Sequence, residues 1–560
     1  MAGGTQHKKE DILMLHRSCF FTGLLLLMAA CQPQGATDGD AALRAHPGQI
    51  EAYMAYLASD DLEGREAGTP GYDAAAAYVA SELEALGVAP GGVDGTYRQT
   101  VPLQRGYRDP DGLSLRATGR GGQALGLVEN EDFVIYGSSR LAQSVATGEA
   151  VFVGYGLVAP DLGQDDYAGL DVEGKVVLML SGMPSGLETE QRAYYSGQRS
   201  REAAARGAVA ILSVPTAESE RRYSFQRLVS EGRLNAASLS WIKPDGEAYT
   251  ATPGLRVGGR LSPEGAAKLF SEAGLDLEAE IAARAEAGVQ RPGHVLPLTL
   301  SLAQQSELDR VQSDNVIGLI EGSDPVLKHD YILMTAHLDH IGVSESFEAD
   351  RINNGALDNA AGVATLLEAA RMILDGPRPR RSILLVFVTA EEKGLLGSQY
   401  FAQNPTVPAE SLVGLVNLDM PVLTYDFTDL VAFGAERSTI GEVVRDVAAD
   451  MSLTLSPDPF PTQGLFTRSD HYRFVQIGVP SVFLATGFAN GGEDAWAAHF
   501  AETYHRPGDD MDNDLNFGAA ARFAEVNARI ARALADGDER PLWRRDDFFA
   551  RQFDGPQVRE

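Results

Sequence analysis

Cysteine is nearly absent from this sequence, which has two in 560 residues, Cys19 and Cys31. Cys19 lies in an apolar run near the amino terminus that we expect to be removed, and a single remaining cysteine cannot form an internal disulfide. The mature chain is therefore predicted to fold without disulfide bonds.

Basic residues are also scarce, because lysine and arginine number 47 against 78 aspartates and glutamates, for a formal net charge of -31. A surface that binds nucleic acid needs clustered lysine and arginine, so we expect no nucleic-acid partner. The simplest meaning of the acidic balance is solubility. Hydrophobic residues at 44% are ordinary for a globular protein, and 560 residues exceed what one core accommodates, so two or three folded units are expected.

The amino terminus has no apolar run long enough to cross a membrane permanently. Residues 19–30 are apolar but short, and Lys8, Lys9 and Arg17 precede them, which is typical of a removable signal peptide at residues 1–30. Translation starting at Met14 would give a more compact leader.

The apolar run ends in Leu-Met-Ala-Ala-Cys at residues 27–31, which resembles the lipobox of bacterial lipoproteins. The resemblance implies a lipidated amino terminus at Cys31, a flexible tether over residues 31–45, and membrane contact only through this anchor. Gln32 replaces the Asp that commonly retains such proteins at the inner membrane, so the outer membrane, facing the periplasm, is favoured. The alternative is simple cleavage after Ala30, which would give a soluble periplasmic or secreted protein.

Three stretches with different sequence patterns follow the tether. Residues 46–114 are expected to contain a helix at 71–86 that Gly87 ends, and residues 115–305 alternate short β-type runs with turns. Residues 306–540 repeat strand, loop and helix, which predicts an α/β fold with a mixed, largely parallel central sheet and helices on both faces. We expect residues 541–560 to form a C-terminal tail.

Histidines and carboxylates follow the predicted strands of the α/β region, where functional groups of such folds collect. His337 follows the strand 331–335, and Asp339 is placed to hold the second nitrogen of a metal-bound imidazole. Asp358 precedes the helix 362–374 and suits either a metal bridge or a helix N-cap, and the N-cap is the better interpretation of this residue alone.

Four more residues repeat this pattern. Glu391 and Glu392 end the strand 382–389, and such a pair can divide metal binding and proton transfer or simply form a solvated charged turn. Asp419 follows the strand 412–418, and His505 comes late in the chain. Each signal is weak by itself. Metal-ligand residue types would have to occur by chance at one strand end after another, so together these residues predict a metal site.

The order of these motifs resembles the co-catalytic zinc exopeptidase family, which includes bacterial leucyl aminopeptidases, glutamate carboxypeptidase and the non-enzymatic transferrin receptor. The motifs are His-x-Asp, Gly-x-x-Asp-Asn-x-x-Gly, Glu-Glu, Asn-Leu-Asp, Ser-Asp-His at 469–471 and the final His. The resemblance covers residues 46–110 and 313–536. It implies an enzyme that holds two zinc ions per chain and acts on peptides.

The family's site residues map onto this sequence by motif. The resemblance implies that one zinc is held by His337 and Asp419 and the other by Glu392 and His505, while Asp358 bridges both ions. It further implies that Glu391 is the general base and that Asp339 orients His337.

The resemblance also bears on the rest of the chain. Residues 144–230, with Gly-Tyr-Gly-Leu at 154–157, resemble the protease-associated (PA) domain that many members carry as an insertion. The flanking parts, 71–86 and 315 onward, should then pack as one catalytic domain. The family often has a cis peptide after its bridging aspartate, which is here the bond Asp358–Asn359.

An aminopeptidase, which hydrolyses the first peptide bond, is the activity we expect. A carboxypeptidase is the alternative, because Arg351, Arg468 and Arg506 lie in or beside the motif loops and could bind a terminal carboxylate. A non-catalytic binding protein is disfavoured because every ligand position is filled, and a glutaminyl cyclase because such enzymes bind one zinc and lack the insertion. The sequence leaves side-chain preference and oligomeric state open.

Overall fold

The computed structural model describes residues 44–559 except 232, 345, 346, 348 and 462. The predicted signal peptide and Cys31 lie outside the described residues. The described residues belong to one compact unit. Within the described ranges, no helix has both the length and the apolar character that a membrane crossing requires.

A mixed sheet with a parallel centre forms the middle of the α/β part. Four neighbouring strands run parallel, β15 (Ser382–Val388), β14 (Tyr331–His337), β16 (Leu412–Leu418) and β19 (Ser481–Thr486). β13 (His294–Ile320) pairs antiparallel with β15 on one side of the sheet, and β17 (Asp429–Phe433) pairs antiparallel with β19 on the other. Beyond them lie β2 (Arg98–Arg108), β1 (Ala89–Pro90) and β18 (Thr454–Ser456).

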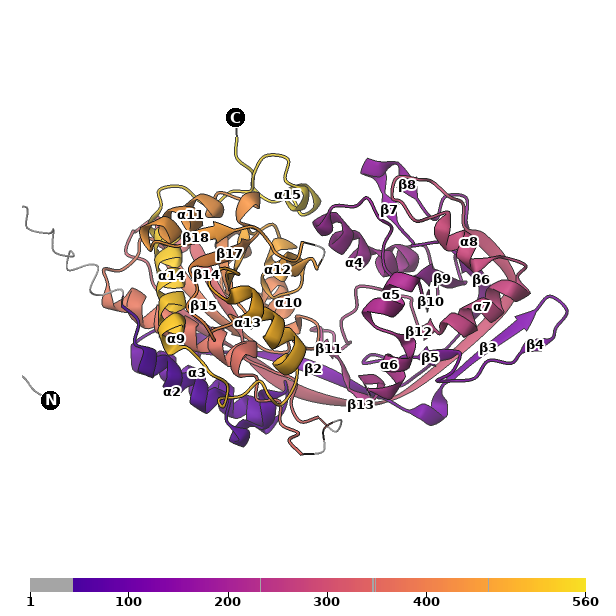
Figure 1. Ribbon diagram of the computed structural model, residues 1–560, viewed down its shortest axis with the longest axis horizontal. Coiled ribbons are helices and arrows are strands. Elements are labelled where there is room, and N and C mark those ends of the chain that lie inside the picture. Colours follow the sequence, from indigo (N-terminus) through magenta and orange to yellow (C-terminus); the bar gives the residue numbers. More distant parts are fainter. Residues whose placement is uncertain (1–43, 232, 345–346, 348, 462, 560) are drawn as a thin grey trace, which may run out of the picture. The chain divides into compact units, whose positions relative to one another are not determined.

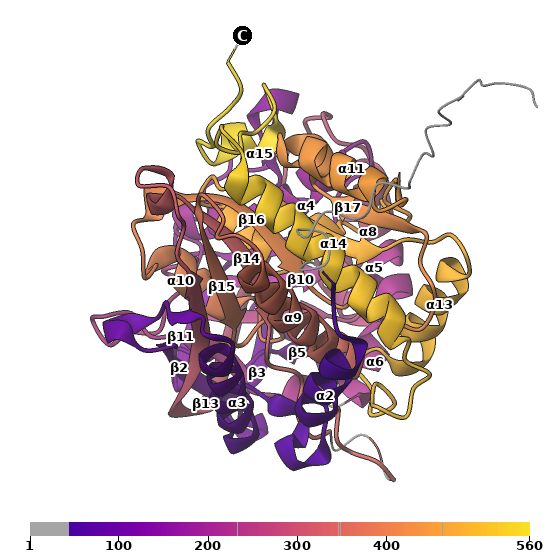
Figure 2. The same cartoon turned by 90° about the vertical axis from the view of Figure 1, so that its left-hand side faces the viewer.

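Helices cover both faces of this sheet because alternate side chains of its buried strands point to opposite faces. On β15, Ile383, Leu385 and Phe387 belong to the core shared with α2 (Pro47–Leu57), α3 (Pro70–Leu86), α9 (Ala361–Asp375), α11 (Ile440–Asp450) and α14 (Phe517–Asp536). Figure 2 shows α9 and α14 lying across this face. Leu384, Val386 and Val388 pack instead with α10 (Leu396–Gln403) and α12 (His471–Val475). The predicted fold class is therefore confirmed.

The amino-terminal helix α3 packs with the part of the chain that follows residue 315. Thr69 caps its first turn by accepting from the Tyr72 N–H, and Gly87 ends it in the left-handed conformation, with a φ of 78°. Its buried residues, including Val79 and Leu83, join the same core as β14 and α9. The two halves flanking the insertion thus build one hydrophobic core.

The inserted region forms a second sheet that shares β13 with the first. Residues 294–305 of β13 pair with β3 (Ser114–Gly119) and β6 (Gln143–Phe152), whereas residues 306–320 pair with β2 and β15. Figure 1 shows β13 running from one sheet into the other. The remaining order continues from β6 through β9 (Val176–Leu180), β10 (Ala210–Val214), β12 (Val257–Leu261) and β5 (Phe133–Ile135).

β4 (Ala124–Leu125) extends this second sheet beyond β3, and within the described part of the chain five helices border the sheet. They are α4 (Thr189–Ala205), α5 (Ala217–Arg222), α6 (Phe225–Ser230), α7 (Pro263–Glu272) and α8 (Leu277–Ala282). The pair β7 (Val158–Ala159) and β8 (Gln164–Asp165) forms a separate small ribbon.

Two segments differ from the expected division of the chain. β11 (Ser238–Trp241), inside the inserted region, pairs with β2 of the first sheet, and Trp241 Nε1 donates to Gln399 Oε1 at 2.9 Å. The expected C-terminal tail is packed, since Trp543 is buried and its Nε1 donates to the Gly478 carbonyl at 2.7 Å, and α15 (Phe548–Gln552) follows it. The sequences of β11 and of residues 541–560 do not by themselves indicate which surface of the protein each segment packs against.

Candidate metal centre

The side chains predicted to bind metal come together at the carboxyl ends of the parallel strands. His337 ends β14, Glu391 and Glu392 follow β15, and Asp419 follows β16. Because these three strands are parallel neighbours, their ends meet at one edge of the sheet. The other two residues come from loops, Asp358 from a turn of π-helix (Ala356–Ala360) and His505 from the stretch after α13 (Gly492–Ala498).

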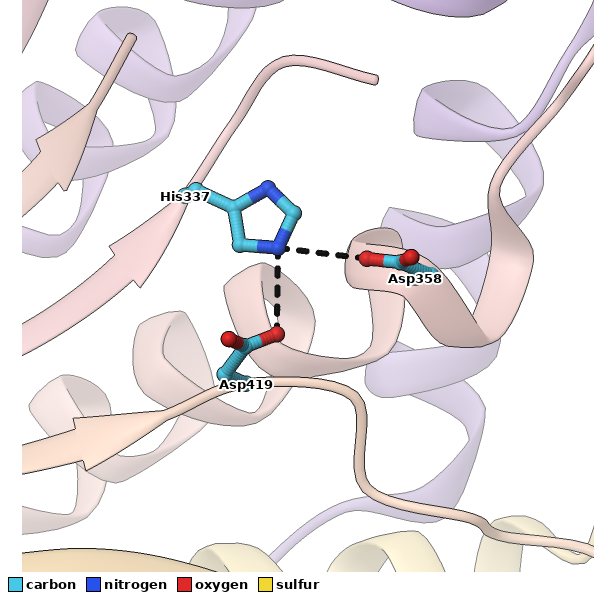
Figure 3. A group of neighbouring side chains, drawn as sticks. All are labelled: His337, Asp358 and Asp419. Atoms are coloured by element: carbon cyan, nitrogen blue, oxygen red, sulfur yellow. Dashed lines mark hydrogen bonds and ion pairs between the residues drawn. The ribbon is translucent and has the colours of Figure 1, made fainter. Parts of the chain in front are cut away.

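One half of the centre is formed by His337, Asp358 and Asp419 (Figure 3). His337 Nε2 lies 3.1 Å from Asp419 Oδ1 and 3.2 Å from Asp358 Oδ1. Each of these three residues offers a nitrogen or oxygen atom, all within 4.8 Å of one another. That spacing suits a single metal ion.

The other half uses the second oxygen of the same aspartate. His505 Nε2 lies 3.2 Å from Asp358 Oδ2 and 3.2 Å from Glu392 Oε2. The two oxygens of Asp358 therefore face two different histidines, which is the arrangement expected of a carboxylate shared by two metal ions.

The structure excludes the interpretation of Asp358 as a helix cap. α9 has Ala360 at its N-cap position, and no side chain caps it. The Asp358 carboxylate faces the two histidines instead, and its own peptide bond to Asn359 is cis, as the resemblance implied. Asp509 holds this turn by accepting from the backbone N–H groups of Leu357 and Asp358, at 2.9 and 3.0 Å.

Asp339 contacts its neighbours differently from the expectation. The nearest acceptor to His337 Nδ1 is the backbone carbonyl of Asp339, at 3.1 Å, whereas the Asp339 carboxylate is 4.0 Å away. That carboxylate accepts from the backbone N–H groups of Glu391 and Glu392, at 3.0 and 3.3 Å. Asp339 thus ties the strand end that carries His337 to the turn that carries both glutamates.

The two adjacent glutamates have opposite electrostatic environments. Burial raises the pKa of the Glu391 carboxyl well above its usual range, although His337 opposes the shift. Burial and Asp358 would also raise the pKa of Glu392, but His505 and His340 hold it at about 2. Neighbouring groups whose pKa values are pushed apart are suited to different tasks, here proton transfer and charge donation to a cation. A merely solvated turn does not describe this pair, since the Glu392 side chain is only 6% exposed.

Three contacting side chains had been assigned no role from the sequence. His340 Nδ1 lies 2.8 Å from Glu392 Oε1, and His340, Asp358 and Glu392 form a second group with metal-ligand spacing. Ser469 Oγ donates to Asp419 Oδ2 at 2.5 Å. The proximity of His340 to the His-x-Asp motif was a usable signal, and Ser469 belongs to the Ser-Asp-His motif, for which the sequence suggested no role.

The third such residue, Arg65, is a buried cation behind the centre. Its guanidinium donates to the backbone carbonyls of Leu338 at 3.1 Å, Asn354 at 2.6 Å and Gly355 at 3.1 Å, and also to that of Leu57. Burial lowers its pKa to about 10, so it is charged at neutral pH. Arg65 therefore joins the loop after His337 to the loop before Asp358, a function that its place in a turn-rich segment far upstream did not indicate.

Comparison with known proteins finds a family match over the segment that carries this centre. Residues 315–531 match peptidase family M28. The aminopeptidase NAALADL1 of Mus musculus is 27% identical over 271 residues, which are 43% of this chain and 34% of that protein. A probable zinc metalloprotease of Leptosphaeria maculans is 34% identical over 110 residues, 20% of this chain and 25% of that protein. The chain thus aligns with only a quarter to a third of these relatives.

The fold has a counterpart among solved structures. The aminopeptidase from Aneurinibacillus sp. strain AM-1 superposes with a TM-score of 0.51 at 19% identity, covering 94% of this chain and 100% of that one. The likeness extends over both sheets, and at this identity it concerns the fold. The span that matches peptidase family M28, residues 315–531, contains all five proposed metal ligands and Glu391.

Proposed function

We propose that this protein is a zinc-dependent aminopeptidase that holds two zinc ions and removes the first residue of a peptide. The observation that carries the proposal is the Asp358 carboxylate, whose two oxygens each lie 3.2 Å from a different histidine. A structural carboxylate needs no such pair of partners, whereas two adjacent cations require a shared anion between them.

The donor set fits zinc. Imidazole nitrogens and carboxylate oxygens are common zinc ligands, and a catalytic zinc keeps a position open for water or substrate. His337 and Asp419 would hold one ion, Glu392 and His505 the other, and Asp358 both. The contact of Asp339 with His337 Nδ1 fixes the ring so that Nε2 faces the other ligands.

The chemistry divides between the ions and Glu391. Bound zinc activates water and polarises a carbonyl group. Glu391 accepts the proton that the attacking water loses and passes it to the leaving amine, and its raised pKa suits a group that must both take and release a proton. Asp339 holds the Glu391 backbone in position by accepting from its N–H.

Peptides are the proposed substrates because the centre lies in a segment of a peptidase family. The name of the murine relative favours cleavage at the amino end. The carboxypeptidase alternative would use an arginine such as Arg351, Arg468 or Arg506 to bind a terminal carboxylate, and the peptide panel below distinguishes it.

The test is a panel of residue-4-nitroanilides and peptides with purified, dialysed protein, with and without added zinc. We expect zinc-dependent release of the first residue from free peptides, no reaction when the amino end is acetylated, and two zinc ions per chain by metal analysis. Cleavage of acetylated peptides from the carboxyl end would replace the aminopeptidase by a carboxypeptidase. One tightly held ion, or no hydrolysis of any substrate, would refute the proposed mechanism.

The proposal extends to the insertion and to location. We propose that residues 144–230 are a PA-type domain and that the protein is anchored to the outer membrane through acylated Cys31, facing the periplasm. The support is the Gly-Tyr-Gly-Leu motif at 154–157 and the lipobox-like residues 27–31. The latter lie outside the described residues.

A further inference from the structure

A cavity of about 500 Å³ lies between the second sheet and a loop of the peptidase domain, and its charge contrasts with the rest of the protein. Residues of the inserted region, from Tyr136 to Arg260, line most of it, and residues 463, 464, 467 and 468 complete it. Four arginines but only one carboxylate, Glu218, line the cavity, in a chain that has 78 acidic and 47 basic residues. Its size is typical of a small-ligand site.

Two of the four arginines are neutralised by neighbours. Arg192 pairs with Glu218 at 2.6 Å, and Arg260 pairs with Glu220 at 2.6 Å. Arg260 is also nearly buried and donates to the Tyr223 carbonyl at 2.8 Å, so it mainly supports the wall.

The other two arginines, Arg222 and Arg468, have no such neighbour. Both are exposed, and among the described residues no carboxylate pairs with either of them. Arg222 ends α5 in the inserted region, whereas Arg468 lies in the peptidase domain, so arginines from both parts of the chain line the cavity. A guanidinium matches a carboxylate in shape and donates two parallel hydrogen bonds to it, which makes the cavity suited to a carboxylate ligand.

Arg468 connects the cavity wall to the proposed metal centre along the chain. The next residue, Ser469, has its Cα about 3.8 Å from that of Arg468, the fixed spacing of a trans peptide. Ser469 Oγ donates to Asp419 Oδ2 at 2.5 Å. The wall of the cavity is thus one residue along the chain from a side chain that contacts a proposed zinc ligand.

The contacts between the two parts support this wall. Thr189 Oγ1 at the start of α4 donates to the Pro461 carbonyl, Arg437 pairs with Glu190 at 3.1 Å, and the Tyr194 and Phe548 rings lie 5.3 Å apart. These three contacts hold α4, the helix that carries Arg192, against the peptidase domain.

We propose that this cavity binds a carboxylate of the peptide downstream of the scissile bond, so that the enzyme prefers short peptides with a free carboxyl end or peptides with an acidic residue there. The inference rests on the proposed aminopeptidase function. It gives the inserted region a role in substrate choice, because Arg222 comes from that region and the metal ligands do not.

The test compares matched peptides that begin with the residue preferred among the 4-nitroanilides. Peptides of three to six residues are used as free acids and as carboxyl-terminal amides, and amidated peptides carry either Glu or Gln downstream. We expect kcat/KM to be about 10- to 100-fold higher for the free acid than for the amide at one or more lengths, the ratio that one charge-assisted hydrogen-bond pair gives. A preference for Glu over Gln in amides would identify the side chain as the source of the carboxylate.

Variants locate the effect. Arg222→Gln and Arg468→Gln should each lower the acid-to-amide ratio toward one, whereas Arg221→Gln, an exposed neighbour outside the cavity, should leave it unchanged. Calorimetric titration of metal-free protein with amino-acetylated peptides, which resist cleavage, should show the same preference for the acid in Kd.

The outcomes separate the two proposals. No hydrolysis of nitroanilides or peptides by zinc-loaded wild type refutes the aminopeptidase function itself. Hydrolysis with an acid-to-amide ratio near one at every length and no Glu preference refutes the carboxylate site alone, as does a ratio that Arg222→Gln leaves intact.

Discussion

Arg65 offers the sharpest test of how the centre is held together, through the substitution Arg65→Met. The side chain is 1% exposed and donates to four backbone carbonyls, two of which, Asn354 and Gly355, immediately precede the Asp358 turn. Methionine fills similar volume but leaves these oxygens without their donor. The loops after His337 and before Asp358 then lose their common support.

The magnitude follows from the number of bonds. Hydrogen bonds to a charged group contribute roughly 1.5–3 kcal/mol each, so four would give about 6–12 kcal/mol if they were independent. They share one side chain and are not additive, and removing a buried cation also removes its desolvation penalty of several kcal/mol. We expect a net destabilisation of about 3–5 kcal/mol, which is a large part of an ordinary stability of about 5–15 kcal/mol.

The assay is urea unfolding of the dialysed, metal-free proteins. Arg65→Lys should fall between wild type and Arg65→Met, because an ammonium keeps the charge but has three donors for four acceptors. Arg221→Met, at an exposed position, should change the free energy of unfolding by less than about 0.5 kcal/mol. If Arg65→Met unfolds within about 1 kcal/mol of wild type, the guanidinium does not hold the loops and the reasoning is wrong. Because Arg65→Lys keeps the positive charge, a loss of bound zinc in this variant would report a change in loop geometry and not a change in charge.

Three further substitutions test the proposed roles. Glu391→Gln should keep zinc and fold but lower kcat by about 100- to 10,000-fold, because the amide cannot accept the proton; kinetics and metal analysis check both parts. Asp358→Ala should lose bound metal as well as activity, because the shared anion between two cations is removed; zinc per chain after dialysis measures it. Cys31→Ser should release an active protein from the membrane fraction or stall it with an uncleaved leader; cell fractionation and the mass of the amino-terminal peptide decide.

Each of these has an outcome that contradicts it. Near-normal turnover of Glu391→Gln would remove Glu391 from the role of base. If Asp358→Ala retained two zinc ions, Asp358 would be a structural residue and not a metal ligand. Asp358→Asn, which keeps the shape of the side chain without its charge, is the matched control. Wild-type protein found wholly in the soluble fraction, with no lipid mass on its amino-terminal peptide, would reduce residues 27–31 to a secretory cleavage site.

The sequence by itself determined the α/β fold and which strand ends carry the histidine and the carboxylates. Strands β14, β15 and β16 are mostly apolar, and His337, Glu391, Glu392 and Asp419 lie at or just after their ends, so parallel pairing was enough to bring these residues to one edge. Helix α3 was predictable because Thr69, the apolar spacing and Gly87 are local signals.

The tertiary structure decided what depends on partners distant in the chain. Asp358 could have been a helix cap until its two oxygens were seen to face His337 and His505. The Asp339 carboxylate binds the glutamate turn and its carbonyl faces His337, a division that no spacing encodes. Trp543 and β11 pack against surfaces that could not be predicted from their own sequences. Arg65 acts across more than 270 residues of sequence, and the cavity joins Arg222 to Arg468. Local patterns fix which groups a segment presents, whereas only packing fixes which groups they meet.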